Sequence, residues 1–248
     1  MKWLRGSPGL CIRGTRCPQL GGVTTRALTP EEISVIVQAL AAKGRHRDKL
    51  FIILLVLTGF RVSELLTITI GQLLTPKGDV ANEISIARKC LKGGHGVHAN
   101  GIRSRRVPLN ARAQAAIADY LASLRVHPTS DTFVFQSRKG VNEHIGRCQA
   151  HHMLKAIARE AGLDASRLGC HSARKTFAKL VHAAGGNDLI KTQRLLGHAS
   201  PMTTAKYLQT TDEELDAIVL GVDPMACRSG AATGTLAHFA VPFAARCV

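Results

Sequence analysis

The spacing of apolar and polar residues predicts that most of the chain is helical. Apolar side chains recur at helical intervals after the sequence TPEE, in which Thr29 supplies an N-cap, Pro30 fits the first turn and Glu32 completes a capping box. A second helix over residues 47–58 is apolar on almost every face in its second half. We therefore expect this helix to be buried and to end at Gly59.

Short alternating segments predict a small sheet among further helices. Apolar and polar residues alternate in three runs, at residues 68–70, 82–88 and 102–109, and the glycine-rich connection 90–101 predicts a hairpin tip. More helices are predicted at residues 110–124 behind an Asn110 cap, at 143–161, from His171 onward, from an Asn187 cap to residue 196, at 201–208 and after Thr211. The predicted fold class is mainly α with a small three-stranded antiparallel sheet.

The charge of the chain indicates what it binds. Lysine and arginine number 33 against 17 acidic residues, a formal net charge of +16 that favours a polyanionic partner. Aromatic residues are only 4%, so contact with the backbone of a DNA duplex is a better interpretation than base stacking. No acid occurs between Ile84 and Ala118, and this segment supplies the predicted DNA-binding residues Arg88, Lys89, Arg103, Arg105 and Arg106.

Several other classes of protein are disfavoured. The seven cysteines include no C-x-x-C pair, the adjacent histidines His151 and His152 would not share a helix face, and no acidic cluster could hold two metal ions. We therefore predict no metal site, and the absence of a Walker-type loop predicts no nucleotide cofactor. The longest apolar run, residues 50–57, is too short to cross a membrane, and no signal peptide is recognisable, so we expect a cytoplasmic protein.

Five residues in two parts of the chain suit phosphodiester chemistry. Arg61 follows the predicted buried helix, and His171 and Arg174 are spaced to share one helix face, with His198 and Tyr207 further along. Arginine binds two phosphoryl oxygens at once and stays charged, while a tyrosine oxygen can attack phosphorus. The set predicts a site that holds a phosphodiester and attacks it with a phenol.

The segments TGFRVSELL, HSAR and LGHASPMTTAKY together resemble the catalytic domain of the tyrosine recombinases, the phage integrase family, over about residues 25–220. The resemblance implies that Arg61 and Arg174 hold the phosphate, that His198 donates a hydrogen bond to it and that Tyr207 is the nucleophile. His171 would accept the phenol proton or hold the phosphate. A hairpin lysine would protonate the leaving 5′ oxygen; Lys92 matches that position best and Lys89 is the second choice.

The resemblance also implies a function and its partners. We expect a site-specific recombinase or integrase of a mobile element, which cleaves and rejoins double-stranded DNA through a 3′-phosphotyrosyl intermediate without metal or ATP. A homotetramer on DNA and accessory DNA-bending proteins are implied as well. A nicking-closing enzyme like the type IB topoisomerases is one alternative.

The expected domain organisation raises a second alternative. We interpret residues 1–24 as a basic, disordered leader, residues 25–220 as the catalytic domain and residues 221–248 as a tail of unknown order. Most tyrosine recombinases carry a helical core-binding domain before the catalytic domain, and the leader does not match one. An inactive DNA-binding remnant is therefore the other alternative.

Overall fold

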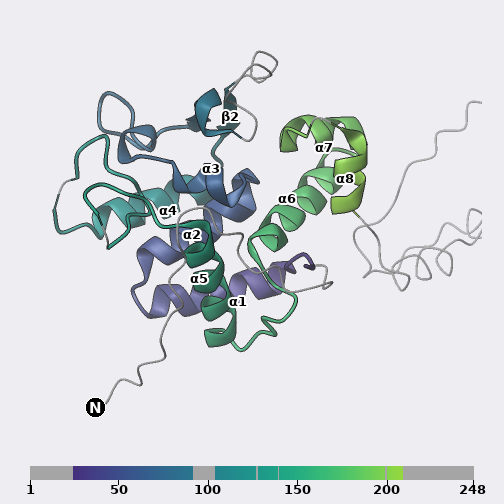
Figure 1. Ribbon diagram of the computed structural model, residues 1–248, viewed down its shortest axis with the longest axis horizontal. Coiled ribbons are helices and arrows are strands. Elements are labelled where there is room, and N and C mark those ends of the chain that lie inside the picture. Colours follow the sequence, from purple (N-terminus) through teal and green to yellow (C-terminus); the bar gives the residue numbers. More distant parts are fainter. Residues whose placement is uncertain (1–24, 92–103, 127, 139, 199, 209–248) are drawn as a thin grey trace, which may run out of the picture. The chain divides into compact units, whose positions relative to one another are not determined.

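The computed structural model describes residues 25–91 and 104–208, except residues 127, 139 and 199, and not the side chain of Lys89 (Figure 1). These residues belong to one compact unit that ends at Leu208. The described elements, in chain order, are α1 (Pro30–Ala42), α2 (His46–Thr58), α3 (Val62–Leu66), the 3-10 helix η1 (Ile70–Gln72), β1 (Glu83–Ile86), the 3-10 helix η2 (Arg88–Cys90), β2 (Arg105–Pro108), α4 (Ala111–Ala122), α5 (Arg147–Glu160), α6 (Cys170–Ala184), α7 (Leu189–Leu196) and α8 (Pro201–Tyr207).

Helix α2 lies at the centre of the core, as its apolar sequence predicts. Leu50, Phe51, Leu54 and Leu55 are completely buried, and α1, α4 and α6 all pack against this helix. A helix that is apolar on every face requires such cover. The helix ends at Gly59, whose φ of 57° lies in the left-handed region that glycine adopts without steric cost.

The helix starts agree with the predicted caps at two positions and differ at a third. Thr29 and Glu32 form the predicted capping box, and the Asn110 side chain accepts the N–H of Ala113. The cap of α7 is Asp188, not Asn187, because the Asp188 carboxylate accepts the N–H groups of residues 190 and 191. Asn187 instead takes a positive φ of 60° in the turn before the cap.

The described sheet has two strands, so the prediction of three was wrong. Strands β1 and β2 pair antiparallel, with Ile84 opposite Val107. The strand predicted at residues 68–70 is reduced to a single bridge between Thr69 and Phe133. The chain then turns into η1, where the backbone N–H groups of residues 70 and 71 donate to the carbonyls of residues 132 and 130. The helix predicted at 143–161 begins late, at Arg147, because His144 forms a bridge with Gln136.

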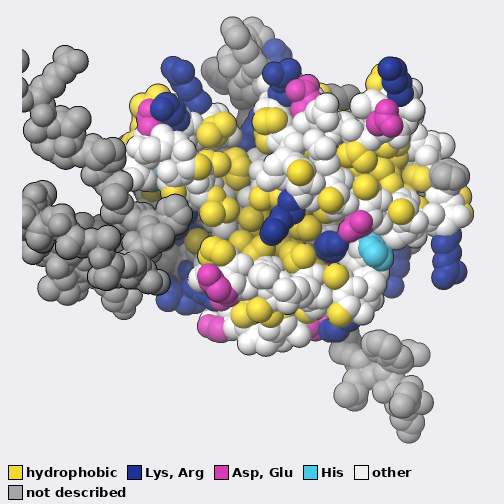
Figure 2. Space-filling model, turned by 180° about the vertical axis from the view of Figure 1, so that it is seen from behind, with side chains coloured by type: hydrophobic (Ala, Val, Ile, Leu, Met, Phe, Trp, Pro, Cys, Tyr) yellow, Lys and Arg dark blue, Asp and Glu magenta, His cyan; other side chains and the backbone are white. Residues whose placement is uncertain are grey.

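Several predictions fall outside the described residues. They are the leader 1–24, most of the hairpin tip, the helix after Thr211, the domain boundary at residue 220 and the tail 221–248. Among the residues that the structure does describe, no helix is long and apolar enough to cross a membrane. On the face shown in Figure 2, basic, acidic and apolar side chains are interspersed.

Candidate active site

The turn between α2 and α3 positions Arg61. It is the N-cap residue of α3, and its Nη1 donates to Glu64 Oε1 at 2.7 Å while its backbone N–H donates to Glu64 Oε2 at 2.9 Å. Glu64 is completely buried, whereas the Arg61 side chain keeps 28% of its exposure. The pair therefore points the arginine outward from an interior carboxylate and is not a surface ion pair.

Arg174 lies on α6 and reaches into the same region. Its side chain is only 1% exposed, and its two terminal nitrogens donate to the carbonyls of Gly59 and Leu196, the latter at 2.6 Å. The Nε–H is buried without a hydrogen-bond partner among the described residues. Burial, followed by the charges of Arg61 and Arg105, lowers the pKa of Arg174 to about 10, so the guanidinium stays charged at neutral pH.

Tyr207 lies at the end of α8, beside two histidines. Its hydroxyl is 3.1 Å from Nδ1 of His171, near the start of α6. Its ring packs against the small cluster of Phe177, Ala178 and Leu196, and its centroid is 5.1 Å from that of His198. Helices α6, α7 and α8 lie together in Figure 1, and their packing fixes the phenol between the two imidazoles.

His198 follows the end of α7 and is almost fully buried. It is 7% exposed, and its Nδ1 is 3.0 Å from the hydroxyl of Thr204, which is itself completely buried. Burial is the largest cause that lowers the pKa of His198 to about 4, and the charges of Arg174, Arg61 and Arg105 add to it. The imidazole is therefore neutral at pH 7.

The structure brings five predicted residues into one site: Arg61, His171, Arg174, His198 and Tyr207. Lys92, Arg103 and the side chain of Lys89 lie outside the described residues, so the assignment of the general acid stays a prediction. Arg88 is exposed. Arg106 is 72% exposed and 3.2 Å from Glu83 on the neighbouring strand.

Arg105 does not lie on the exposed basic edge where the sequence placed it. Its side chain is 11% exposed and its Nη1 lies 3.3 Å from Glu64 Oε2. The period of a strand brings Arg105 to the same face as Val107, which is buried, so it points inward while Arg106 points to solvent. The three residues that sequence reasoning did not assign to the site are thus Glu64, Arg105 and Thr204.

The sequence features that could have pointed to Glu64, Arg105 and Thr204 differ in strength. Glu64 stands three positions after Arg61, a spacing that could have indicated its reach back to the start of α3. Arg105 gave no signal beyond strand alternation, because its partners are distant in sequence. Thr204 gave none, although its partner His198 is only six positions away. Among the described residues there is also no group of three or more metal-ligating side chains that could hold an ion.

The family model described as the phage integrase family matches residues 26–214, which include all five residues of this site. The chain belongs to the phage integrase family. It is 30% identical over 200 residues to the tyrosine recombinase XerA of Pyrococcus furiosus, a match that covers 81% of this chain and 63% of XerA. The chain therefore spans less than two thirds of that relative's length.

Two solved structures of recombinases resemble this family member. A crystal structure of XerA recombinase superposes with a TM-score of 0.61 at 22% identity, and covers 79% of this chain and 63% of that one. XerH recombinase bound to its palindromic difH substrate, in a post-cleavage complex, gives a TM-score of 0.58 at 25% identity, with 79% of this chain and 52% of that one covered. The first establishes the fold, which is that of a tyrosine recombinase catalytic domain.

Proposed function

We propose that this chain is a site-specific DNA recombinase that cleaves a strand with the Tyr207 hydroxyl and rejoins it through a 3′-phosphotyrosyl intermediate. The observation that carries the proposal is the 3.1 Å contact between the Tyr207 hydroxyl and His171 Nδ1, near the buried guanidinium of Arg174. A phenol that donates its proton to an imidazole becomes a better nucleophile. Of the two roles expected for His171, this contact favours the proton acceptor.

The charges of the site support a bound phosphodiester. Arg61, Arg105 and Arg174 contribute three positive charges, and Glu64 is the acid that faces them. The excess of positive charge is matched by the negative phosphodiester, and fixed donors stabilise the charge that grows on the phosphoryl oxygens. Arg61 and the unpartnered Nε–H of Arg174 are the donors we assign to those oxygens.

His198 would complete this set as a neutral donor. When the Thr204 hydroxyl donates to Nδ1, the proton of the imidazole resides on Nε2, which is then free to donate to a phosphoryl oxygen. The reaction forms the O–P bond to Tyr207 and breaks the bond to the 5′ oxygen, which leaves as a hydroxyl after it takes a proton. Lys92, with Lys89 as second choice, would supply that proton. No ATP is needed, because the phosphotyrosyl link conserves the bond energy. No metal ion is needed, because the arginines meet the charge on the phosphoryl oxygens.

The proposal extends to partners and location. Double-stranded DNA is the substrate, a homotetramer assembled on DNA is the active state, accessory DNA-bending proteins assist, and the protein acts in the cytoplasm on DNA of a mobile element. Residues 25–220 are the proposed catalytic domain. XerH in complex with difH DNA supports the choice of partner by likeness.

A covalent-trapping assay tests the chemistry. Nicked duplexes that tile the DNA flanking the gene would be incubated with the protein without metal or ATP, and adducts counted on a denaturing gel. Tyr207→Phe should bind DNA normally and form no adduct. The matched control is Tyr120→Phe, which removes the other tyrosine of the chain, a buried residue whose hydroxyl donates to Val134 O; its adduct yield should equal that of the wild type.

The same assay separates the alternatives. An adduct that persists in Tyr207→Phe would move the nucleophile elsewhere. DNA binding without an adduct on any duplex would favour the inactive remnant. Adducts combined with relaxation of plasmids irrespective of their sequence would favour a nicking-closing enzyme of the topoisomerase type.

A further inference from the structure

The Arg105 side chain joins segments of the site that are far apart in sequence. Its Nη2 donates to Thr58 O at 3.1 Å and to Leu195 O at 2.9 Å, while its Nη1 contacts Gly59 O at 3.4 Å and Glu64 Oε2 at 3.3 Å. One planar guanidinium thus links the end of α2, the first turns of α3 and the end of α7. Arginine can do this because its donors are held in a rigid fork.

Packing fixes the guanidinium in this orientation. Its central carbon lies 4.9 Å from the centroid of the Phe60 ring, which is completely buried. Its stem passes the end of α7, where a Cβ placed on Gly197 would be 3.8 Å from Arg105 Cδ. A cation that stacks on an aromatic face and also satisfies several carbonyls has few other conformations open to it.

Arg105 and Arg174 share one support. Both donate to the carbonyl of Gly59, and they bind the consecutive carbonyls of Leu195 and Leu196 respectively. These carbonyls lie at the C-terminal ends of α2 and α7, where the helix dipoles favour positive charge. Glu64 is shared in the same way, because one oxygen accepts from the Arg61 side chain and the other faces Arg105.

We propose that Arg105 is a positioning residue that holds Arg61, through Glu64, and Arg174, through the shared carbonyls of the two helix ends, in the geometry that cleavage requires. Arg105 acts from inside the protein and makes no DNA contact. This inference rests on the proposed cleavage activity. It replaces the DNA-binding role that the sequence suggested for Arg105, while Arg106 keeps that prediction.

The electrostatics agree with this arrangement. Burial and then the charge of Arg61 lower the pKa of Arg105, against the opposing influence of Glu64. Arg105 in turn contributes to the lowered pKa values of Arg174 and His198. The charge of Arg105 affects these pKa values, whereas its several hydrogen-bond donors hold the neighbouring segments together. A lysine at this position would keep the charge but not the fork of donors.

The test compares Arg105→Met, Arg105→Lys and the neighbouring Arg106→Met. DNA affinity would be measured as a function of salt, cleavage by single-turnover adduct formation on the nicked duplex, and the His198 pKa by NMR titration. We expect Arg105→Met to bind with wild-type affinity and salt dependence but to cleave about 100-fold more slowly, the size of effect expected when a catalytic group is misplaced by about 1 Å. Its His198 pKa should rise above about 4.

Arg105→Lys should restore the low His198 pKa but not the cleavage rate, because a lysine cannot reach Glu64 and Leu195 at the same time. Arg106→Met should cleave normally once bound. It should weaken binding and reduce the slope of log affinity against log salt by about 1, as the loss of one phosphate contact does.

Three results would overturn the inference. One is wild-type cleavage by Arg105→Met or by Arg105→Lys; the lysine variant decides the question if the methionine variant does not fold. The second is a reduced salt slope in Arg105→Met, which would make Arg105 a DNA contact. The third is an unchanged His198 pKa in Arg105→Met. The measurement of the His198 pKa remains informative even if the wild type forms no adduct. The absence of an adduct in the wild type would count against the proposed function itself.

Discussion

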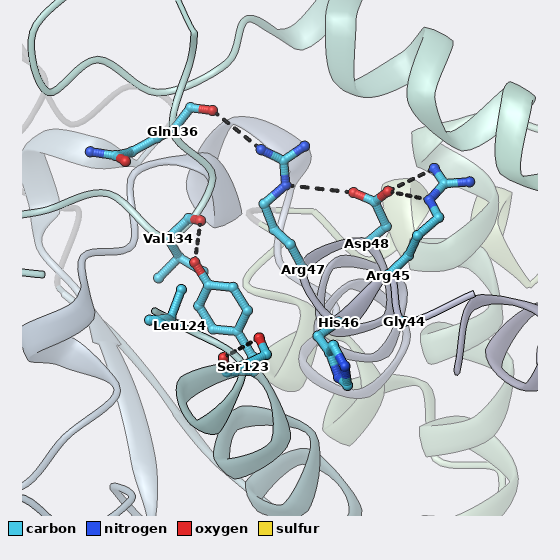
Figure 3. A pocket seen from close by; sticks show the side chains of 10 residues that line it. Gly44, Arg45, His46, Arg47, Asp48, Ser123, Leu124, Val134 and Gln136 are labelled. Carbon is cyan, nitrogen blue, oxygen red and sulfur yellow. Dashed lines mark hydrogen bonds and ion pairs between the residues drawn. The ribbon is translucent and has the colours of Figure 1, made fainter. Parts of the chain in front are cut away.

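Each end of α2 carries a cluster of charged side chains. The two clusters are similar in composition, but only the one at the C-terminal end belongs to the candidate active site. Before and within the first turn, Asp48 lies between Arg45 and Arg47, with Arg45 Nη2 at 2.7 Å and Arg47 Nε at 3.6 Å (Figure 3). After the last turn, Glu64 lies between Arg61 and Arg105. Each cluster places one buried carboxylate between two arginines.

The surroundings of the two clusters differ in charge. At the first end, Glu160 also accepts from Arg45 and from Lys43, so two acids face three bases. Arg45, Arg47 and Asp48 also line a hollow of about 400 Å³. At the second end, a further arginine, Arg174, adds to the cations. An acid in the first turn of a helix is already favoured by the helix dipole, as cations are at the last turn. The first end therefore has one positive charge without a matching acid, whereas the second end has two, which favours an anion at the second end.

The pKa values of the arginines follow this difference. Burial acts to lower the pKa of Arg45, but the hydrogen bond to Asp48 and the charges of Asp48 and Glu160 raise it overall. Burial and Arg61 together lower the pKa of Arg105 despite Glu64. An arginine whose pKa is lowered gains from a bound anion, which supports the phosphate site at the second end alone.

Removal of the central acid at each end gives the largest expected contrast. Glu64→Gln leaves Arg61 and Arg105 without a counter-charge, so we expect a loss of about 3–5 kcal/mol in the free energy of unfolding. Cleavage by the folded fraction should slow by about 100- to 1000-fold, as when one preorganised group is lost. Urea unfolding and single-turnover cleavage would measure both.

The matched variant is Asp48→Asn. Arg45 keeps Glu160 as a partner, and the Arg45 and Arg47 side chains are 29% and 43% exposed to water. We expect a loss of about 1–2 kcal/mol, typical of a hydrogen bond to a charged group, and an unchanged cleavage rate. Equal slowing of cleavage in the two variants would show that the comparison between the two ends is wrong.

A glycine at each end offers the next contrast. Gly44 and Gly59 both have a positive φ, of 62° and 57°. A Cβ on Gly44 would meet nothing within 4 Å, whereas one on Gly59 would overlap the ring of Phe177. Gly44→Ala should therefore cost only the left-handed strain of about 1 kcal/mol, and Gly59→Ala about 1–3 kcal/mol more from overpacking.

Gly59→Ala should also slow cleavage, because it displaces the carbonyl that both Arg105 and Arg174 bind. Thermal unfolding and adduct formation would be measured on both alanine variants at a temperature where each is folded. A Gly59→Ala protein that is as stable and active as Gly44→Ala would exclude this carbonyl as a support of the site.

Local patterns predicted local structure well, and contacts between distant segments poorly. The Thr29 and Asn110 caps, the buried α2 and its end at Gly59 follow from neighbouring residues. The roles proposed for Arg61, Arg174 and Tyr207 came from residue type and motif, and the structure brings these residues into one site. The inward turn of Arg105 did not, because its partners Thr58, Glu64 and Leu195 are set by tertiary packing.

The same reason explains the missing third strand. Residues 68–70 have a strand-like pattern, but their backbone partners lie at residues 130–134, and no local signal shows that the pairing is limited to one bridge. The pKa of His198 is likewise a property of the assembled site, since it depends on burial and on charges from α3, β2 and α6.

The last expected effect is a pH dependence of stability that belongs to the second end of α2. The pKa of His198 is about 4 in the folded protein and about 6.5 in an unfolded chain. Below pH 6.5 the unfolded chain binds a proton that the folded site excludes, so this contribution to stability is complete above pH 6.5 and is lost as the pH falls towards 4. The groups that face the imidazole are Arg61, Glu64, Arg105, Arg174, Thr204 and Tyr207.

The loss should amount to about 2–3 kcal/mol of unfolding free energy across that range. Urea unfolding of the wild type and of His198→Asn at several pH values would measure it, and the variant should show a correspondingly flatter profile. At the first end Arg45 stays charged throughout this range because its pKa is raised, so it adds no slope. Equal slopes in the two proteins would mean that burial and the arginines do not hold His198 neutral, and the tautomer argued for phosphate donation would lose its support.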